Sequence, residues 1–118
     1  MTYKACFPTG EEDEVDIVSL ESYLISDPHS SFLYKVKDSS LRGIGIFKND
    51  LVIVDKKKSP STGDIILVRI EDEGTLKIFK KQRSVIILGS SHPDYPNLYL
   101  QQEEFHILGI VTTIIRKV

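Results

Sequence analysis

Apolar residues recur at short, regular intervals from Phe32 to the end of the chain, and polar stretches with glycine or proline separate them. Runs of this length, rich in valine, isoleucine and aromatic residues, are typical of β-strands. Several short strands with turn signals between them predict a small, mostly β fold with a partly closed sheet. We expect the strands over 32–37, 51–55, 64–70, 75–79, 84–88, 98–100 and 107–115, with a hairpin turn at 71–74.

The pattern differs ahead of these strands. Leu20, Tyr23 and Leu24 have the i, i+3, i+4 spacing of one helical face, and Ser19 is a suitable N-cap. The residue before Pro28 avoids the helical region, so the helix ends before it. We therefore predict one short N-terminal helix over about 19–25.

The first fifteen residues have a different composition from the rest of the chain. They contain Pro8, Gly10 and an unbroken acidic run over 11–14. Such a segment buries little apolar surface and usually stays solvated. We therefore predict a flexible N-terminal arm over 1–15 and a single folded domain over 16–118.

Composition narrows the class of protein. The chain has 118 residues, 41% hydrophobic and 27% charged, as in ordinary globular proteins. A net charge of −2 gives no reason to predict sequence-specific DNA binding. Cys6 is the single cysteine, which excludes an internal disulfide and favours the cytoplasm. No apolar run is long enough to span a bilayer, so we expect no membrane partner.

The remaining polar clusters have ordinary explanations. His29, His92 and His106 lack paired spacing and neighbouring cysteines, so we expect no metal and no other cofactor. The lysines at 56–58 and 80–81 are better interpreted as solvated loop residues than as a DNA-binding patch.

Ser40 and Lys77 are the candidate catalytic residues. Serine is a weak nucleophile until a base takes its proton, and lysine is a base only when burial keeps it neutral. Ser40 follows a predicted strand at a bend, and a backbone N–H at or next to it is the expected oxyanion donor. Lys77 alternates with Leu76 and Ile78 in a strand. By residue type alone, a turn serine and a solvated lysine are the commoner interpretation.

The surrounding sequence favours the chemical interpretation, because it resembles the C-terminal peptidase domain of the LexA, phage-repressor and UmuD proteins. The similarity covers 34–41 and 46–55 around Ser40, then 63–70, then 74–81 around Lys77, and it reaches 107–111. Domains of that family cleave their own chain with a serine and a lysine. The resemblance implies that Ser40 is the nucleophile and Lys77 its general base.

The short arm is more similar to UmuD than to LexA, which has a helix-turn-helix domain ahead of the peptidase domain. The family's scissile bond usually joins alanine or cysteine to glycine, and the resemblance places it at Ala5-Cys6, so the chain is similar to the processed form of UmuD. It also implies a cytoplasmic homodimer that serves a Y-family, UmuC-like DNA polymerase in translesion synthesis during the SOS response. A RecA filament on single-stranded DNA would promote the cleavage.

Asp38-Ser39 departs from the family pattern, which is Gly-Asp ahead of the nucleophile. A carboxylate at position 38 favours a charged Lys77, and Ser39 offers a second hydroxyl beside Ser40. Two interpretations therefore stay open: an active peptidase, and a catalytically inactive dimerisation or polymerase-binding module on the same fold. A third, a relative of bacterial signal peptidase, is disfavoured because no membrane segment is present.

Overall fold

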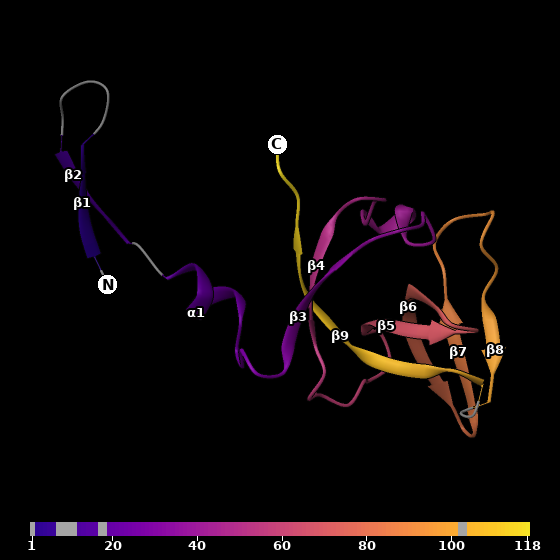
Figure 1. Ribbon diagram of the computed structural model, residues 1–118. Coiled ribbons are helices and arrows are strands. Elements are labelled where there is room, and N and C mark those ends of the chain that lie inside the picture. Colours follow the sequence, from indigo (N-terminus) through magenta and orange to yellow (C-terminus); the bar gives the residue numbers. More distant parts are fainter. Residues whose placement is uncertain (1, 7–11, 17–18, 102–103) are drawn as a thin grey trace.

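The computed structural model describes residues 2–6, 12–16, 19–101 and 104–118, and their side chains from residue 19 onward. Its elements confirm the predicted fold class, which is mostly β with one short α-helix (Figure 1). The elements are β1 (Thr2–Cys6), β2 (Glu12–Asp16), α1 (Leu20–Leu24), β3 (Ser31–Lys35), the 3₁₀ turn η1 (Arg42–Ile44), β4 (Leu51–Asp55), β5 (Ile65–Ile70), β6 (Glu73–Gln82), β7 (Val85–Gly89), β8 (Leu98–Leu100) and β9 (His106–Ile115).

One seven-stranded sheet forms the body of the molecule, in the order β3-β4-β9-β5-β6-β7-β8. Neighbouring strands are antiparallel, and β3 and β8 are the two edges. The last strand, β9, is inserted in the middle and has a register shift opposite each of its neighbours. Such irregularities increase local bending, and β9 curves across the sheet in Figure 1.

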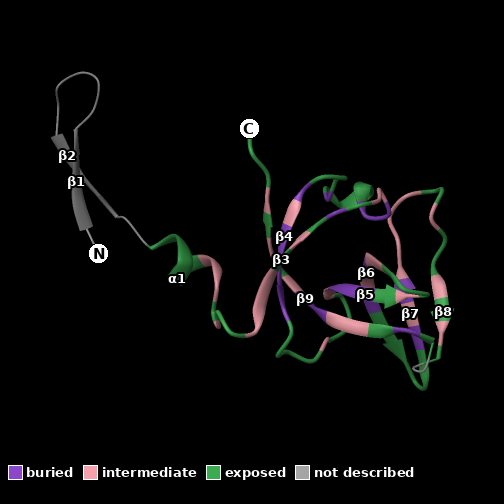
Figure 2. Cartoon of the chain, viewed as in Figure 1, coloured by how far each residue is buried: buried purple, intermediate pink, exposed green. Residues whose placement is uncertain are grey.

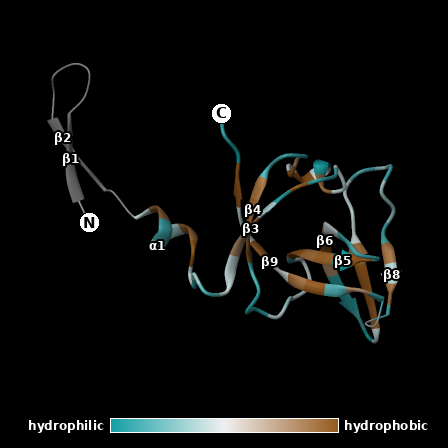
Figure 3. Cartoon of the chain, viewed as in Figure 1, coloured by the Kyte–Doolittle hydropathy of each residue, from teal (hydrophilic) through white to brown (hydrophobic). Residues whose placement is uncertain are grey.

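The central strands bury side chains on both faces of the sheet, since successive residues of a strand point to opposite sides and both sets are covered. On β5, Leu67 belongs to one apolar cluster, whereas Ile66 and Val68 belong to the other. Figures 2 and 3 show that the buried and the hydrophobic positions coincide on the central strands. The first cluster is Val36, Leu41, Ile46, Val52, Val54, Leu67 and Leu76, and the second is Ile66, Val68, Phe79, Ile86, Leu88, Phe105 and Ile110.

The predicted strands of the large sheet are all present, and the hairpin between β5 and β6 is tighter than predicted. Glu71 and Asp72 have φ of 50° and 67° and form a two-residue turn between the paired residues Ile70 and Glu73. Positive φ at both central residues is the geometry of a type I′ turn, whose twist suits a hairpin. As a result Gly74, predicted in the turn, lies within β6.

The predicted helix is also present, as α1. Ser19 is its N-cap, with the Ser22 N–H donating to Ser19 Oγ at 3.5 Å. No residue of α1 is buried, and the apolar side chains Leu20 and Tyr23 are 78% and 75% exposed. Its apolar face is therefore largely uncovered, in contrast to the strands.

The N-terminal residues contain two strands that the sequence pattern did not predict. β1 pairs with β2 in an antiparallel register from Thr2 opposite Asp16 to Cys6 opposite Glu12. This hairpin lies apart from the large sheet, on the far side of α1 (Figure 1). The boundary between arm and domain near residue 15 stays a prediction. No helix in the described part of the chain is long and apolar enough to cross a membrane.

Candidate active site

Ser40 lies in the loop between β3 and β4, and two backbone hydrogen bonds close this loop at its base. The Val36 N–H donates to the Asp50 carbonyl at 2.9 Å, and the Asn49 N–H donates to the Val36 carbonyl at 2.8 Å. Leu41, beside the serine, is an anchor in the first apolar cluster. Ser40 itself is 1% exposed, and its Oγ donates to the Leu76 carbonyl at 3.0 Å. The hydroxyl is thus held against the backbone of β6.

Lys77 lies on β6 and is 5% exposed. Its Nζ donates to Ser90 Oγ at 3.0 Å and lies 5.5 Å from the centre of the Tyr95 ring. Burial lowers the pKa of Lys77, and the Asp38 carboxylate acts against that change. Loss of the charge is the change that a lysine general base requires.

The structure therefore brings the two predicted residues to one place. The carbonyl that accepts the Ser40 hydroxyl belongs to Leu76, the residue immediately before Lys77. Within the described residues, no hydrogen bond joins Ser40 Oγ to Lys77 Nζ directly. In this arrangement the Ser40 hydroxyl donates to the Leu76 carbonyl and not to the amine.

Asp38 ties the serine turn to β6. Its Oδ1 accepts the Ser40 N–H at 3.0 Å, and its Oδ2 accepts the Thr75 hydroxyl at 2.7 Å. Burial by itself raises the pKa of Asp38, but the hydrogen bonds from Ser40 and Thr75 outweigh it and hold the pKa below the usual value. An anionic carboxylate thus accepts the hydrogen bond of the Ser40 N–H, a group that the sequence had suggested as an oxyanion donor.

The loop that follows β7 completes the site. The Ser91 N–H donates to the Ser40 carbonyl at 2.7 Å, and the Ser90 N–H donates to Asn97 Oδ1 at 3.0 Å. A Cβ at Gly43 would lie 2.2 Å from the Ser91 carbonyl oxygen, so this close approach requires glycine. Sequence reasoning missed the roles of Ser90, Ser91 and Asn97.

Comparison with known protein families matches residues 2–112 to the family described as Peptidase S24-like. The chain belongs to the Peptidase S24-like family. The resemblance to LexA/UmuD-like self-cleaving peptidases is thereby confirmed.

Individual relatives of this S24-like chain include both long and short proteins. The LexA repressor of Providencia rettgeri is 36% identical over 91 residues, which are 75% of this chain and 44% of the repressor. Protein SamA of Salmonella typhimurium (strain LT2) is 34% identical over 106 residues, 90% of this chain and 71% of SamA. The chain therefore spans less than half the length of that LexA repressor and more than two thirds of SamA.

The predicted cleavage bond of the S24-like chain lies away from Ser40. Ala5 and Cys6 belong to β1, opposite Asp13 and Glu12 of β2, and their side chains lie outside the described part. Figure 1 shows this hairpin separated from the large sheet by α1. The structure thus places Ser40 and Lys77 at one site, and the Ala5-Cys6 bond lies away from that site.

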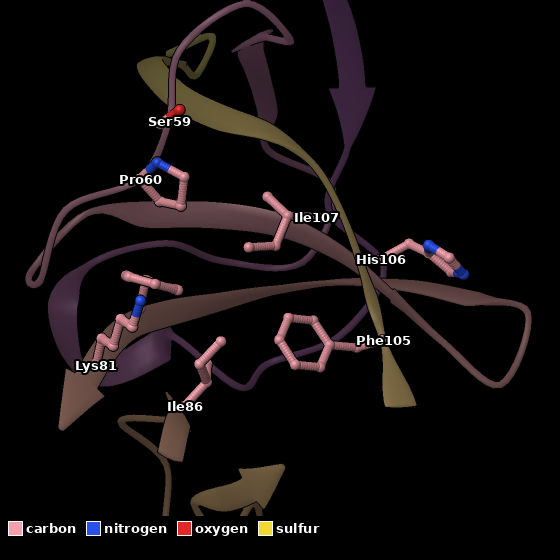
Figure 4. A pocket seen from close by; sticks show the side chains of 8 residues that line it. Ser59, Pro60, Lys81, Ile86, Phe105, His106 and Ile107 are labelled. Atoms are coloured by element: carbon pink, nitrogen blue, oxygen red, sulfur yellow. The ribbon is translucent and has the colours of Figure 1, made fainter. Parts of the chain in front are cut away.

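A hollow of about 510 Å³ lies over the second apolar cluster. Figure 4 shows Ile86, Phe105 and Ile107 around it, with His106 pointing away. Neither Ser40 nor Lys77 lines this hollow. Among the described side chains, no group of three or more His, Cys, Asp or Glu residues is arranged to hold a metal ion.

Proposed function

We propose that this S24-like chain is a UmuD-like protein of the SOS response that cleaves itself at Ala5-Cys6, with Ser40 as nucleophile and Lys77 as general base. The observation that supports the proposal most is the environment of Lys77. Lys77 is 5% exposed, and burial disfavours the charged form of its amine. The Ser40 hydroxyl donates to the carbonyl of Leu76, the residue before Lys77.

The reaction follows from these roles. Neutral Lys77 takes the Ser40 hydroxyl proton as Oγ attacks the carbonyl carbon of Ala5. The tetrahedral intermediate collapses when the resulting ammonium returns that proton to the nitrogen of Cys6, which leaves as an amine. Water then attacks the ester between Ser40 and Ala5 with Lys77 again as base, and the Ser40 hydroxyl is restored.

Delivery of the bond requires a movement or a second molecule. β1 lies apart from Ser40, so either the hairpin swings about the exposed α1 or the arm of a homodimer partner supplies the bond. In either case α1 is the connecting element. Because it has few buried contacts, such a rearrangement costs little free energy.

We further propose that the cleaved form, as a homodimer, is the accessory subunit of a Y-family translesion polymerase, and that a RecA filament on single-stranded DNA promotes the cut. The resemblance of the arm to UmuD supports this role. The net charge of −2 argues for recruitment through protein contacts and not through direct DNA binding.

Intact mass followed over time tests the peptidase proposal. Purified protein is held at neutral and alkaline pH, with and without a RecA–single-stranded DNA filament, beside a Ser40→Ala variant. Loss of the segment from Met1 to Ala5 in the parent and not in the variant is the expected result. The same loss from the Ser40→Ala variant would overturn the assignment of the nucleophile.

The catalytically inactive dimerisation or polymerase-binding module is the second candidate, and Asp38 is the observation that favours it. Its carboxylate occupies the Ser40 N–H and raises the pKa of Lys77, and both effects oppose catalysis. Restoring the family pattern with Asp38→Gly and Ser39→Asp separates the candidates. Cleavage gained only in the double variant indicates a decayed site on an intact fold, whereas cleavage by the parent chain excludes an inactive module.

A further inference from the structure

Ser90 faces Lys77 because of the register of the β6–β7 hairpin. The pairs run from Gln82 opposite Val85 to Ile78 opposite Gly89, so the next position along each chain places Ser90 opposite Lys77. Directly opposed residues of antiparallel strands project their side chains on the same face within contact distance. The 3.0 Å hydrogen bond from Nζ to Ser90 Oγ is the result.

The backbone around Ser90 is fixed on both sides. Its own N–H donates to Asn97 Oδ1 at 3.0 Å, and the N–H of the next residue, Ser91, donates to the Ser40 carbonyl at 2.7 Å. Two adjacent residues of one loop therefore contact both members of the proposed pair, one at the Lys77 side chain and one at the Ser40 backbone. Displacement of this loop would change the position of one group relative to the other.

We propose that Ser90 is the positioning residue of Lys77, whose amine it orients by accepting one N–H, an inference that rests on the proposed peptidase function. A neutral amine has two N–H donors and one lone pair. With one donor held by Ser90 Oγ, the rotation of the amine is restricted and the lone pair has a defined direction for the Ser40 proton. Ser90 acts through Lys77 and does not contact the scissile bond.

The other groups that face the amine do not replace this contact. Asp38 is the charged group whose field reaches Lys77, and its two carboxylate oxygens are engaged by Ser40 and Thr75. Tyr95 offers a ring face at 5.5 Å, which attracts an ammonium but does not orient a neutral amine. Among the described residues, Ser90 Oγ is therefore the oxygen that holds Nζ.

Removal of the hydroxyl has two separable consequences. The ammonium loses its acceptor, so the charged form becomes less stable and the pKa of Lys77 falls. The neutral amine loses its orientation, so the cleavage rate falls even at high pH, where every amine is neutral. A role in folding alone would lower the rate without moving the titration midpoint of Lys77.

The test compares self-cleavage rates across pH for Ser90→Ala, for Ser90→Thr, which keeps a hydroxyl, and for Ser84→Ala, the same change at an exposed turn. Ser90→Ala should lower the high-pH rate about tenfold, as expected for one lost hydrogen bond, and shift the midpoint to lower pH. Ser90→Thr should recover most of the rate, and Ser84→Ala should match the parent. A parental rate and midpoint in Ser90→Ala would overturn the proposal.

A second measurement separates this proposal from the peptidase function. NMR titration of the Lys77 side chain is carried out in the uncleavable Ser40→Ala background, with and without Ser90→Ala, and with Asn97→Ala as a milder variant. The Lys77 midpoint should fall in Ser90→Ala and fall less in Asn97→Ala. Unchanged midpoints in both variants overturn the role of Ser90. If Ser90→Ala shifts the Lys77 midpoint in this background and the chain with Ser40 intact never cleaves, the peptidase function is overturned and the Ser90 contact is established.

Discussion

The region around Ser40 and Lys77 and the region of α1 are built in opposite ways. Ser40 and Lys77 are 1% and 5% exposed and are held by hydrogen bonds from the β3–β4 loop, β6 and the loop after β7. Leu20 and Tyr23 of α1 are 78% and 75% exposed, and no residue of that helix is buried. Figure 2 shows the same contrast across the molecule.

The contrast suits the self-cleavage proposed above. Reacting groups need a rigid and dry setting, because misplacement or hydration of a base reduces its effect. In that proposal the segment that delivers the bond must move, and a segment with few buried contacts opens at low free energy. Under the proposed function, a well-packed site and a weakly packed connecting helix would allow delivery of the Ala5-Cys6 bond without unfolding of the sheet.

The largest effect expected in the well-ordered region comes from Lys77→Ala. Loss of a general base typically costs at least about a hundredfold in rate, so self-cleavage at alkaline pH should be lost on the time scale of the parent. Lys80→Ala, the same change at an exposed position of the same strand, should cleave as the parent does. Intact mass measures both, with circular dichroism to confirm folding, and cleavage by Lys77→Ala at the parental rate would remove the proposed base.

Gly43→Ala should break the site through its backbone. The added Cβ would lie 2.2 Å from the Ser91 carbonyl oxygen, so the loop that holds Ser40 must shift. Overpacking of this kind costs about 1–3 kcal/mol of unfolding free energy, and cleavage should slow as well.

Urea unfolding measures that loss of stability against Gly89→Ala, where the nearest contact of a Cβ is an ordinary 3.5 Å. Equal stability of the two variants would show that the loop containing Ser91 moves aside at little cost in free energy. The site would then not be rigid.

The sequence predicted the strands better than it predicted the contacts of the site. Apolar runs such as 51–55 mark buried strands whatever their neighbours are, and β4 has those same bounds. The contact between Ser90 and Lys77 depends on the register of the β6–β7 hairpin, and that register depends on a tight turn in which Arg83 has a φ of 56°. The predicted strands ended at 79 and resumed at 84, whereas β6 runs to Gln82 and β7 begins at Val85. Neither the length of β6 nor the turn at 83–84 was predicted, so the residue opposite Lys77 could not be identified.

Asp38 illustrates a different limit of sequence reasoning. Its carboxylate was predicted to favour a charged Lys77, and the structure agrees with that electrostatic effect. The hydrogen bond from the Ser40 N–H is local and depends on the conformation of the turn, which the sequence pattern did not give. The hydrogen bond from Thr75 requires the β3–β4 loop to meet β6, two segments far apart in the chain. The paired strands β1 and β2 were missed because the acidic residues of β2 show no apolar alternation.

The pH dependence of cleavage tests the electrostatic part of the site. The rate should rise with pH as Lys77 loses its proton. In Asp38→Asn the curve should move to lower pH, because the carboxylate raises the pKa of Lys77 and its removal makes the neutral amine available earlier. Asparagine keeps an oxygen that accepts the Ser40 N–H, and its amide NH2 donates to the Thr75 hydroxyl oxygen, so both contacts are retained while the charge is removed. Asp72→Asn, at the exposed β5–β6 turn, is the control, and a curve that moves to higher pH would contradict the assignment.

The smallest effect is expected in α1, and it tests the other side of the comparison. Leu20→Ala removes apolar atoms that are 78% exposed, so the free energy of unfolding should change by no more than about 0.5 kcal/mol. Leu88→Ala, the same change at a side chain with 0% exposure, should cost about 2–5 kcal/mol. Urea unfolding at two protein concentrations measures both variants. If Leu20→Ala proved as costly as Leu88→Ala and the cost grew with concentration, a second copy of the chain would be covering α1. The helix would then belong to the homodimer interface, and its freedom to deliver the Ala5-Cys6 bond would depend on dissociation of that interface.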